Sequence, residues 1–101
     1  MDLDLNKVTV TNNEEAQRFE ATIEGQKAVI NYKRLPDRIV LVHTEVPPAF
    51  EGHGLAGKLA KTALDFARTN NLRVVPQCPY VAHYVGKHPE YQDLVSGNAA
   101  L

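Results

Sequence analysis

The residues best suited to chemistry lie in a glycine-rich turn, Glu51-Gly-His-Gly-Leu-Ala-Gly57. A strand-like run precedes this turn, and an alanine- and leucine-rich run typical of a helix follows it. Such a turn leaves several backbone N–H groups unpaired at the positive end of the helix dipole, where a phosphate or pyrophosphate binds well. No Gly-Lys-Ser/Thr follows, so the lysine-dependent P-loop is excluded. The sequence therefore predicts a phosphate site made of backbone.

A second candidate group is the single cysteine, Cys78. Pro79 suits the first position of a helix, which would put Cys78 at the N-cap, where free amides and the helix dipole favour a thiolate. A thiolate is a nucleophile that accepts acyl groups. The alternative is that Cys78 is a small buried hydrophobic side chain, as most lone cysteines are.

The histidines do not predict a metal site. His83 and His88 are five residues apart, and no thiol or carboxylate lies at zinc-ligand spacing. His53 lies inside the glycine-rich turn, where either contact with a phosphate or exposure to solvent is open to it. We therefore expect no bound metal.

The bulk properties predict a small intracellular domain. At 101 residues, with a net charge of −1, the chain suits one hydrophobic core and no general attraction to nucleic acid or membrane. We expect a single domain over 1–101, with 96–101 flexible. No apolar run reaches about 20 residues and no signal-peptide pattern opens the chain. Together with the lone cysteine, this predicts a cytoplasmic protein.

Two kinds of element must position the candidate groups. The N-terminal half predicts antiparallel strands over 7–11, 18–23, 27–33 and 38–46, with Asn12-Asn13 breaking the first of them. His43 and Glu45 would share one face of the last strand. In the second half, the spacing predicts a helix from Leu55 that ends at Asn70-Asn71, then a strand over 72–76 parallel to 38–46. A helix from Pro79 that breaks at Gly86 and a short turn or helix over 88–94 complete the chain.

This order of elements resembles the core of the GNAT acetyltransferases, whose acyl-CoA pyrophosphate binds a turn of pattern Arg/Gln-x-x-Gly-x-Gly/Ala. Gly54 and Ala56 match that pattern, whereas Glu51 stands where Arg or Gln is usual. An acid this close to an anion would weaken coenzyme binding unless its side chain points away.

Further motifs resemble one branch of that family. They are Thr44-Glu-Val-Pro-Pro, Val75-Pro-Gln-Cys-Pro-Tyr-Val and His88-Pro-Glu-Tyr, the last preceded by Tyr84. Together with the turn they are similar to the minimal GNAT-like N-acetyltransferase family, the short N-acetyltransferase domain-containing proteins related to the bacterial YjdJ proteins. The resemblance runs from about Phe19 to Leu94.

The resemblance implies an α/β fold of the α+β kind. A mixed, mainly antiparallel sheet would be flanked by helices, and a splayed parallel strand pair would form the cleft for CoA. It implies acetyl-CoA as cosubstrate, with the pyrophosphate on the turn and the thioester near Cys78. The residues expected to bind it are Val46, Gly52, His53, Gly54, Leu55, Ala56, Gly57 and Lys58.

The expected activity is acetyl transfer to an unidentified amine, a protein or peptide amine among the candidates, by direct transfer or through Cys78. For direct transfer, Glu45 is the candidate base and Tyr84 the candidate acid. A solvated strand-end acid and a core tyrosine are the respective alternatives. His88-Pro-Glu-Tyr91 is interpreted as packing that closes the far side of the acyl pocket.

Two other functions remain open at this point. One is a non-catalytic acyl-CoA-binding module, and the other is a site for a different phosphate-bearing ligand on the same turn. We expect a monomer or weak homodimer.

Overall fold

The computed structural model describes residues 4–95 of the chain. Within these residues, five strands form one mixed sheet in the order β1-β2-β3-β4-β5, and of the four strand pairs the β4–β5 pair is the parallel one. This confirms the expected α/β fold with a parallel strand pair at one side. The strands are β1 (Val10–Asn13), β2 (Arg18–Ile23), β3 (Gln26–Arg34), β4 (Arg38–Glu45) and β5 (Arg73–Pro76).

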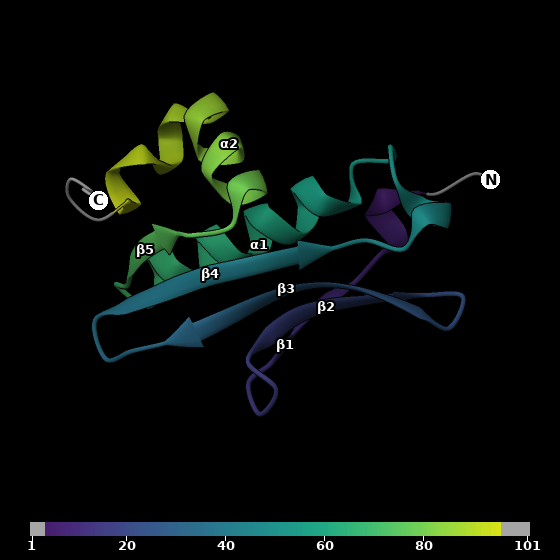
Figure 1. Cartoon of the computed structure of the whole chain (residues 1–101), viewed down its shortest axis with the longest axis horizontal. Helices are drawn as coiled ribbons and strands as arrows, with labels where there is room; N and C mark the ends of the chain where they lie inside the picture. The colour runs from purple at the N-terminus through teal and green to yellow at the C-terminus, as the bar shows by residue number, and fades with distance from the viewer. Residues whose placement is uncertain (1–3, 96–101) are drawn as a thin grey trace.

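The two α-helices follow β4 and β5 in the chain. Helix α1 (Leu55–Thr69) lies along the sheet, and α2 (Pro79–Lys87) packs beside α1 and against β4 and β5 (Figure 1). The predicted start of α1 and its end before Asn70 are confirmed. The predicted break at Gly86 is wrong by one residue, because α2 continues to Lys87. Three short 3-10 helices complete the fold: η1 (Leu5–Lys7), η2 (Pro48–Phe50) and η3 (Pro89–Leu94).

The core lies between α1 and one face of the sheet. Along α1 the buried residues recur at helical spacing, and many of them are alanines that let the helix approach the strands closely. The strands contribute alternate residues, such as Ile39 and Leu41 of β4, both fully buried. Val42 of the same strand is 41% exposed. The side of the sheet that faces α1 is therefore the one on which a buried site can form.

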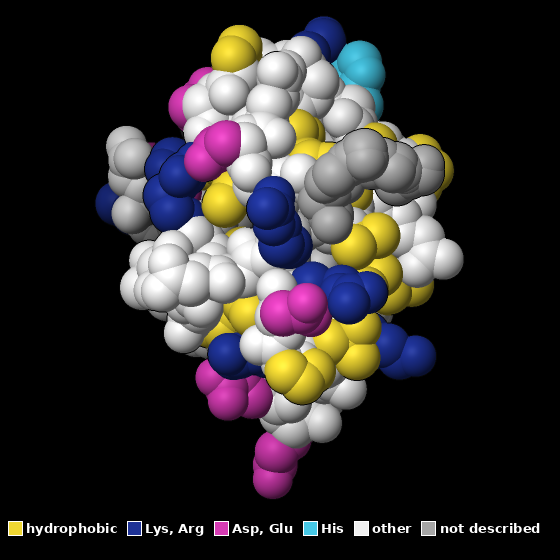
Figure 2. Space-filling view, turned by 90° about the vertical axis from the view of Figure 1, so that its left-hand side faces the viewer, with side chains coloured by type: hydrophobic (Ala, Val, Ile, Leu, Met, Phe, Trp, Pro, Cys, Tyr) yellow, Lys and Arg dark blue, Asp and Glu magenta, His cyan; other side chains and the backbone are white. Residues whose placement is uncertain are grey.

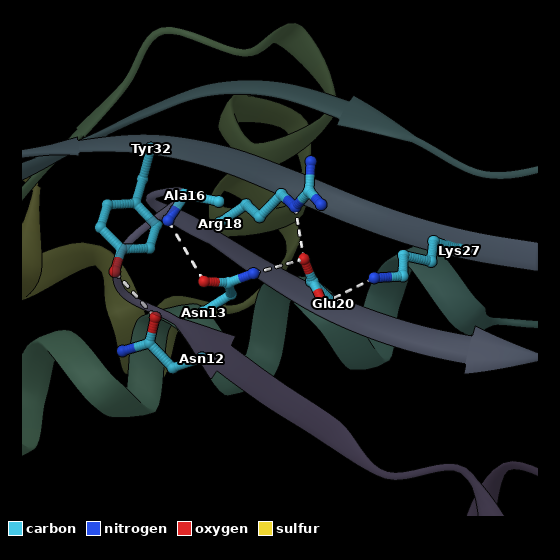
Figure 3. Close-up of polar contacts among 7 residues, drawn as sticks. All are labelled: Asn12, Asn13, Ala16, Arg18, Glu20, Lys27 and Tyr32. Atoms are coloured by element: carbon cyan, nitrogen blue, oxygen red, sulfur yellow. Dashed lines mark hydrogen bonds and ion pairs between the residues drawn. The ribbon is translucent and has the colours of Figure 1, made fainter.

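The first strand begins and ends later than predicted. Asn12 and Asn13 belong to β1 instead of ending it, since they pair with Phe19 and Arg18 of β2. Their side chains also make tertiary contacts: the Tyr32 hydroxyl donates to Oδ1 of Asn12 at 2.7 Å (Figure 3). Hydrogen bonds of this kind overcome the low strand propensity of asparagine.

A buried carboxylate joins the first three strands. Glu20 of β2 is 8% exposed and accepts hydrogen bonds from Nε of Arg18 and from Nδ2 of Asn13, the latter at 3.0 Å (Figure 3). Nζ of Lys27 on β3 lies 3.4 Å from its other oxygen. The hydrogen bond from Arg18, followed by that from Asn13, lowers the pKa of Glu20 below its ordinary value and outweighs burial.

Glu20→Gln is expected to lower the free energy of unfolding by about 1 to 2 kcal/mol at neutral pH, since the hydrogen bonds to a charged acceptor are weakened. The folded-state pKa of Glu20 is depressed, so its contribution is complete above the ordinary carboxyl range and is lost as pH falls through the folded pKa. Urea unfolding of both proteins between neutral and acid pH measures this. A difference between them that stays constant on acidification would contradict the role given to Glu20.

The surface at the end of the molecule that carries β5 and the β3–β4 turn shows basic and acidic side chains side by side (Figure 2). Across residues 4–95, no helix is long and apolar enough to cross a membrane. The predicted flexibility of 96–101 lies outside the described residues.

Candidate functional site

A bulge in β4 decides which side chains face the helices. In the β3–β4 ladder Ile30 pairs with Thr44 and Tyr32 pairs with Leu41, so the register shifts by one residue at Val42. Without the extra residue, Leu41 and Thr44 would lie on opposite faces. The bulge therefore brings Thr44 to the buried face that Ile30 and Tyr32 share.

The parallel strands separate just beyond this bulge. Pairing of β4 with β5 ends at Leu41 and Pro76, after which the β5 chain turns into α2. The amide of Cys78 donates to the Leu41 carbonyl at 2.8 Å and so anchors the start of α2 against β4. Sγ of Cys78 then lies 3.2 Å from Oγ1 of Thr44. The predicted N-cap position of Cys78 is confirmed.

The glycine-rich turn has the backbone geometry that the sequence predicted. Gly52 and Gly54 have φ values of +84° and +82°, the left-handed region that favours glycine. Gly54 is also the N-cap of α1, and because it has no side chain it cannot cap the first amides of that helix. Within residues 4–95, the amides of 52–57 make no backbone hydrogen bond, and the first helical bond runs from Lys58 to Gly54. The turn thus presents unpaired donors at the positive end of α1.

One pocket of about 370 Å³ joins the turn to the end of β4. Thr44 of β4 and Tyr80 of α2 line it, together with residues from the segment that joins β4 to α1: Val46, Phe50, Glu51, Gly52, Gly54 and Ala56. Its size falls within the range of small-molecule sites. Because Thr44 contacts Cys78, the sulfur lies directly behind the pocket wall.

The thiol of Cys78 is 4% exposed. Burial by itself raises its pKa, but the hydrogen bond with Thr44 and the amides of Val81 and Tyr80 outweigh burial, so the net pKa lies below the ordinary value. The sulfur makes no N-cap hydrogen bond of standard geometry. Those two amides nevertheless point their positive ends toward it and favour the thiolate.

The expected coenzyme-binding residues divide into two groups. Val46, Gly52, Gly54 and Ala56 line the pocket, whereas His53, Leu55, Gly57 and Lys58 do not. Leu55 is buried in the core, Gly57 packs under Tyr80 and Tyr84, and Nζ of Lys58 donates to the Leu5 carbonyl. The amides of His53, Leu55 and Gly57 still belong to the turn, so backbone contact with a ligand remains the prediction for these three, whereas the Lys58 amide donates to the Gly54 carbonyl.

Glu45 lies apart from Cys78. It pairs with Val29 in the ladder, on the face opposite to Thr44, and its side chain is 72% exposed. His43 shares that face, as expected, with Nε2 at 3.9 Å from the Glu45 carboxylate. A base at this position is able to reach an acceptor only from the outer side of the sheet.

Tyr84 also lies outside the pocket lining. Its ring stacks on His88 at 4.0 Å between centroids, and burial raises its pKa. Tyr91 of the same motif is buried and donates to Asp65 of α1 at 2.7 Å. The motif over 88–91 therefore packs η3 against α1, and it does not line the pocket.

Sequence reasoning missed three pocket residues, Thr44, Phe50 and Tyr80. Tyr80 lies half-buried in the wall, and its pKa is raised first by burial and then by Tyr84 and Cys78. Its hydroxyl therefore keeps its proton at neutral pH. The helical spacing from Cys78 gave a weak signal for Tyr80, since a residue in the first turn of α2 must lie close to the N-cap.

Glu51 is an exposed residue that lines the pocket. Glu51→Gln is expected to tighten binding of acetyl-CoA several-fold, because it removes a negative charge beside an anionic ligand. The gain shrinks as salt is added, since the repulsion is screened. Calorimetric titration at low and high ionic strength measures both effects. Equal affinities of the two proteins at low salt would place the anion elsewhere.

Comparison with known proteins gives consistent matches. A family model described as GCN5-related N-acetyl-transferase matches residues 18–94. Protein NATD1 of Mus musculus is 38% identical over 85 residues, which cover 81% of this chain and 77% of that protein. Protein NATD1 of Danio rerio is 32% identical over 94 residues, with coverage of 88% and 86%. An NMR structure of a GCN5-like putative N-acetyltransferase from Staphylococcus aureus superposes with a TM-score of 0.63 at 28% identity, covering 88% of both chains.

Proposed function

This chain belongs to the GCN5-related N-acetyltransferase family, and on that premise we propose that it transfers the acetyl group of acetyl-CoA to an amine by way of Cys78. The observation that carries the proposal is the pocket that joins the glycine-rich turn to Thr44, directly beside the Cys78 sulfur. The pocket extends from the unpaired amides of the turn to a residue that contacts the nucleophile.

The pocket residues fit acetyl-CoA. Unpaired amides of the turn suit the pyrophosphate, and Gly54 has a positive φ at which a Cβ would lie 3.0 Å from Cδ1 of Leu5, which argues for a required glycine. Val46 and Phe50 offer an apolar wall to the pantetheine arm. Acetyl-CoA would supply an activated acetyl group as a thioester.

The chemistry assigned to the protein follows from its own groups. The Cys78 thiolate attacks the thioester carbon, forming an Sγ–acetyl bond while the bond to the CoA sulfur breaks. Tyr80, protonated at neutral pH, is the group in the pocket able to give the leaving sulfur a proton. A neutral amine then attacks the acetyl group, and Cys78 leaves as the thiolate. The amine loses its proton to solvent, and Tyr80 takes a proton back from solvent, which closes the cycle.

Direct transfer with Glu45 as base is the second route to the same product. It needs the acceptor to enter from the outer face of β4, where Glu45 and His43 are exposed. Tyr84 stays a predicted acid for this route.

A non-catalytic acyl-CoA-binding module is the alternative function, and the deep burial of the Cys78 thiol favours it. Such a protein would keep the turn and the pocket but would need no nucleophile. The need for an acceptor amine also separates the enzyme from the module, because a non-catalytic module requires no acceptor.

Thermal unfolding with acetyl-CoA, desulfo-CoA and ATP, followed by an amine screen for release of free CoA thiol, tests the proposal. We expect both coenzyme forms to raise Tm well above the effect of ATP, and CoA release beyond one equivalent per protein to depend on an added amine. Stabilisation by ATP equal to that by desulfo-CoA would indicate a general phosphate site. Stabilisation without CoA release from any peptide or small amine would indicate the module, and no stabilisation at all would overturn the coenzyme site.

A further inference from the structure

We infer that Thr44 is a positioning residue for Cys78. The Thr44 hydroxyl holds the Cys78 sulfur at the pocket wall and donates a hydrogen bond to the thiolate. The catalytic meaning of this contact rests on the proposed function. The contact itself is a property of the free protein and is testable without any coenzyme.

The geometry fixes both partners of this contact. Thr44 reaches the inner face only because of the bulge at Val42, and it lies 3.2 Å from the sulfur. Two backbone hydrogen bonds hold Cys78 in place. Its amide donates to the Leu41 carbonyl, and its carbonyl accepts from the amide of Ala82 at 3.0 Å. The sulfur therefore has little freedom to leave the hydroxyl.

The contact between Thr44 and Cys78 matters because the charged groups that usually lower the pKa of a cysteine thiol do not lie beside Cys78. Reactive cysteines commonly lie beside His, Lys or Arg, yet no basic side chain of residues 4–95 lowers the pKa of Cys78. From α2 the titratable group that faces it is Tyr80, which is neutral at physiological pH. On β4, His43 and Glu45 point to the opposite face, and from the turn Glu51 brings a negative charge to the pocket. Among these groups, the Thr44 hydroxyl is the side-chain donor left to the thiolate.

Thr44 also faces the ligand side, whereas Cys78 does not line the pocket. The Thr44 hydroxyl, 3.2 Å from a sulfur that is almost fully buried, offers the thiolate a fixed dipole in place of water. Replacing it by a methyl group would leave the shape unchanged and remove the donor. Shape and hydrogen bonding are therefore separable at this position.

The test is a pH titration of the Cys78 thiolate by its ultraviolet absorbance in wild type, Thr44→Val, Thr44→Ala and Thr44→Ser. Cys78 is the single cysteine, and the pKa values of all four tyrosines are raised, so thiolate formation is resolved from tyrosinate formation. Thr62→Val is the matched control, because Thr62 is another half-buried threonine whose hydroxyl donates to the Lys58 carbonyl at 2.9 Å.

We expect Thr44→Val and Thr44→Ala to move the thiolate transition to higher pH and to lower the thiolate fraction at neutral pH by about tenfold. Thr44→Ser restores most of the wild-type curve, and Thr62→Val leaves it unchanged. The rate of alkylation by iodoacetamide at neutral pH follows the same order.

A wild-type titration curve in both Thr44→Val and Thr44→Ala would overturn the inference, and so would a Thr44→Ser curve displaced as far as theirs. These readouts involve no acetyl-CoA, so they stand apart from the proposed function. Should acetyl-CoA fail to bind while the titrations behave as expected, the proposed function fails and the role of Thr44 in holding the thiolate survives.

Discussion

Cys78→Ala is expected to gain no acetyl group from acetyl-CoA, whereas the wild-type protein gains one. Turnover with an amine acceptor falls by at least about a hundredfold, the scale of a single nucleophilic or acid–base group. The coenzyme-induced rise in Tm is retained, because Cys78 lies behind the pocket wall and alanine removes only the sulfur. Loss of chemistry without loss of binding is the signature of a nucleophile.

Intact-protein mass spectrometry after incubation with acetyl-CoA measures the adduct. Denatured wild-type protein is the control for chemical acetylation, since unfolding destroys the Thr44 contact. Glu45→Gln is the matched variant, because its side chain lies on the other face of β4 and the adduct should form as before. An adduct of equal yield in Cys78→Ala would contradict the route through this thiol, and full turnover in that variant would favour direct transfer.

Gly54→Ala is expected to weaken acetyl-CoA binding by about tenfold or more. At φ +82° an L-residue is strained by roughly 1 to 2 kcal/mol, and its Cβ would also lie 3.0 Å from Cδ1 of Leu5. A backbone shift that relieves the φ strain or the contact with Leu5 would also move the amides expected to hold the pyrophosphate. In the double variant, Leu5→Ala removes the steric contact with the new Cβ, so it should recover part of the affinity.

Two other glycines separate strain from site geometry. Gly25 in the β2–β3 turn has φ +79° with open space around it, so Gly25→Ala should lower stability and leave the coenzyme affinity unchanged. Gly52→Ala carries the same strain inside the turn without the Leu5 contact. Calorimetric titration with unfolding measurements on each variant gives both quantities. A Gly54→Ala protein that binds acetyl-CoA as tightly as wild type would show that the turn does not hold the ligand.

The parts of the site that depend on local signals were predictable from the sequence. The unpaired amides of the glycine-rich turn, the start of α1 and the N-cap position of Cys78 each follow from residues within a few positions of one another. The parallel pairing of β5 with β4 followed from the handedness of the strand–helix–strand connection. Composition and spacing are sufficient for such features because no distant contact is needed to specify them.

The parts that depend on tertiary contacts were not predictable. The bulge at Val42 has no glycine or proline to signal it, so the inward direction of Thr44 could not be read from strand alternation. The packing of Leu5 against Gly54 joins residues nearly fifty positions apart, and it comes from a segment that strand propensity assigned no role. Glu20 is buried through partners on two strands, whereas its residue type favours exposure.

The most direct test of the coenzyme site is an amide NMR titration of the wild-type protein with acetyl-CoA. We expect the largest chemical-shift changes on the amides of Gly52 to Gly57, with further changes at Thr44, Cys78 and Tyr80. ATP should affect the turn more weakly and leave Cys78 unchanged. Shifts confined to other parts of the fold, or no shift at saturating acetyl-CoA, would contradict a coenzyme pocket between the turn and the Cys78 thiol.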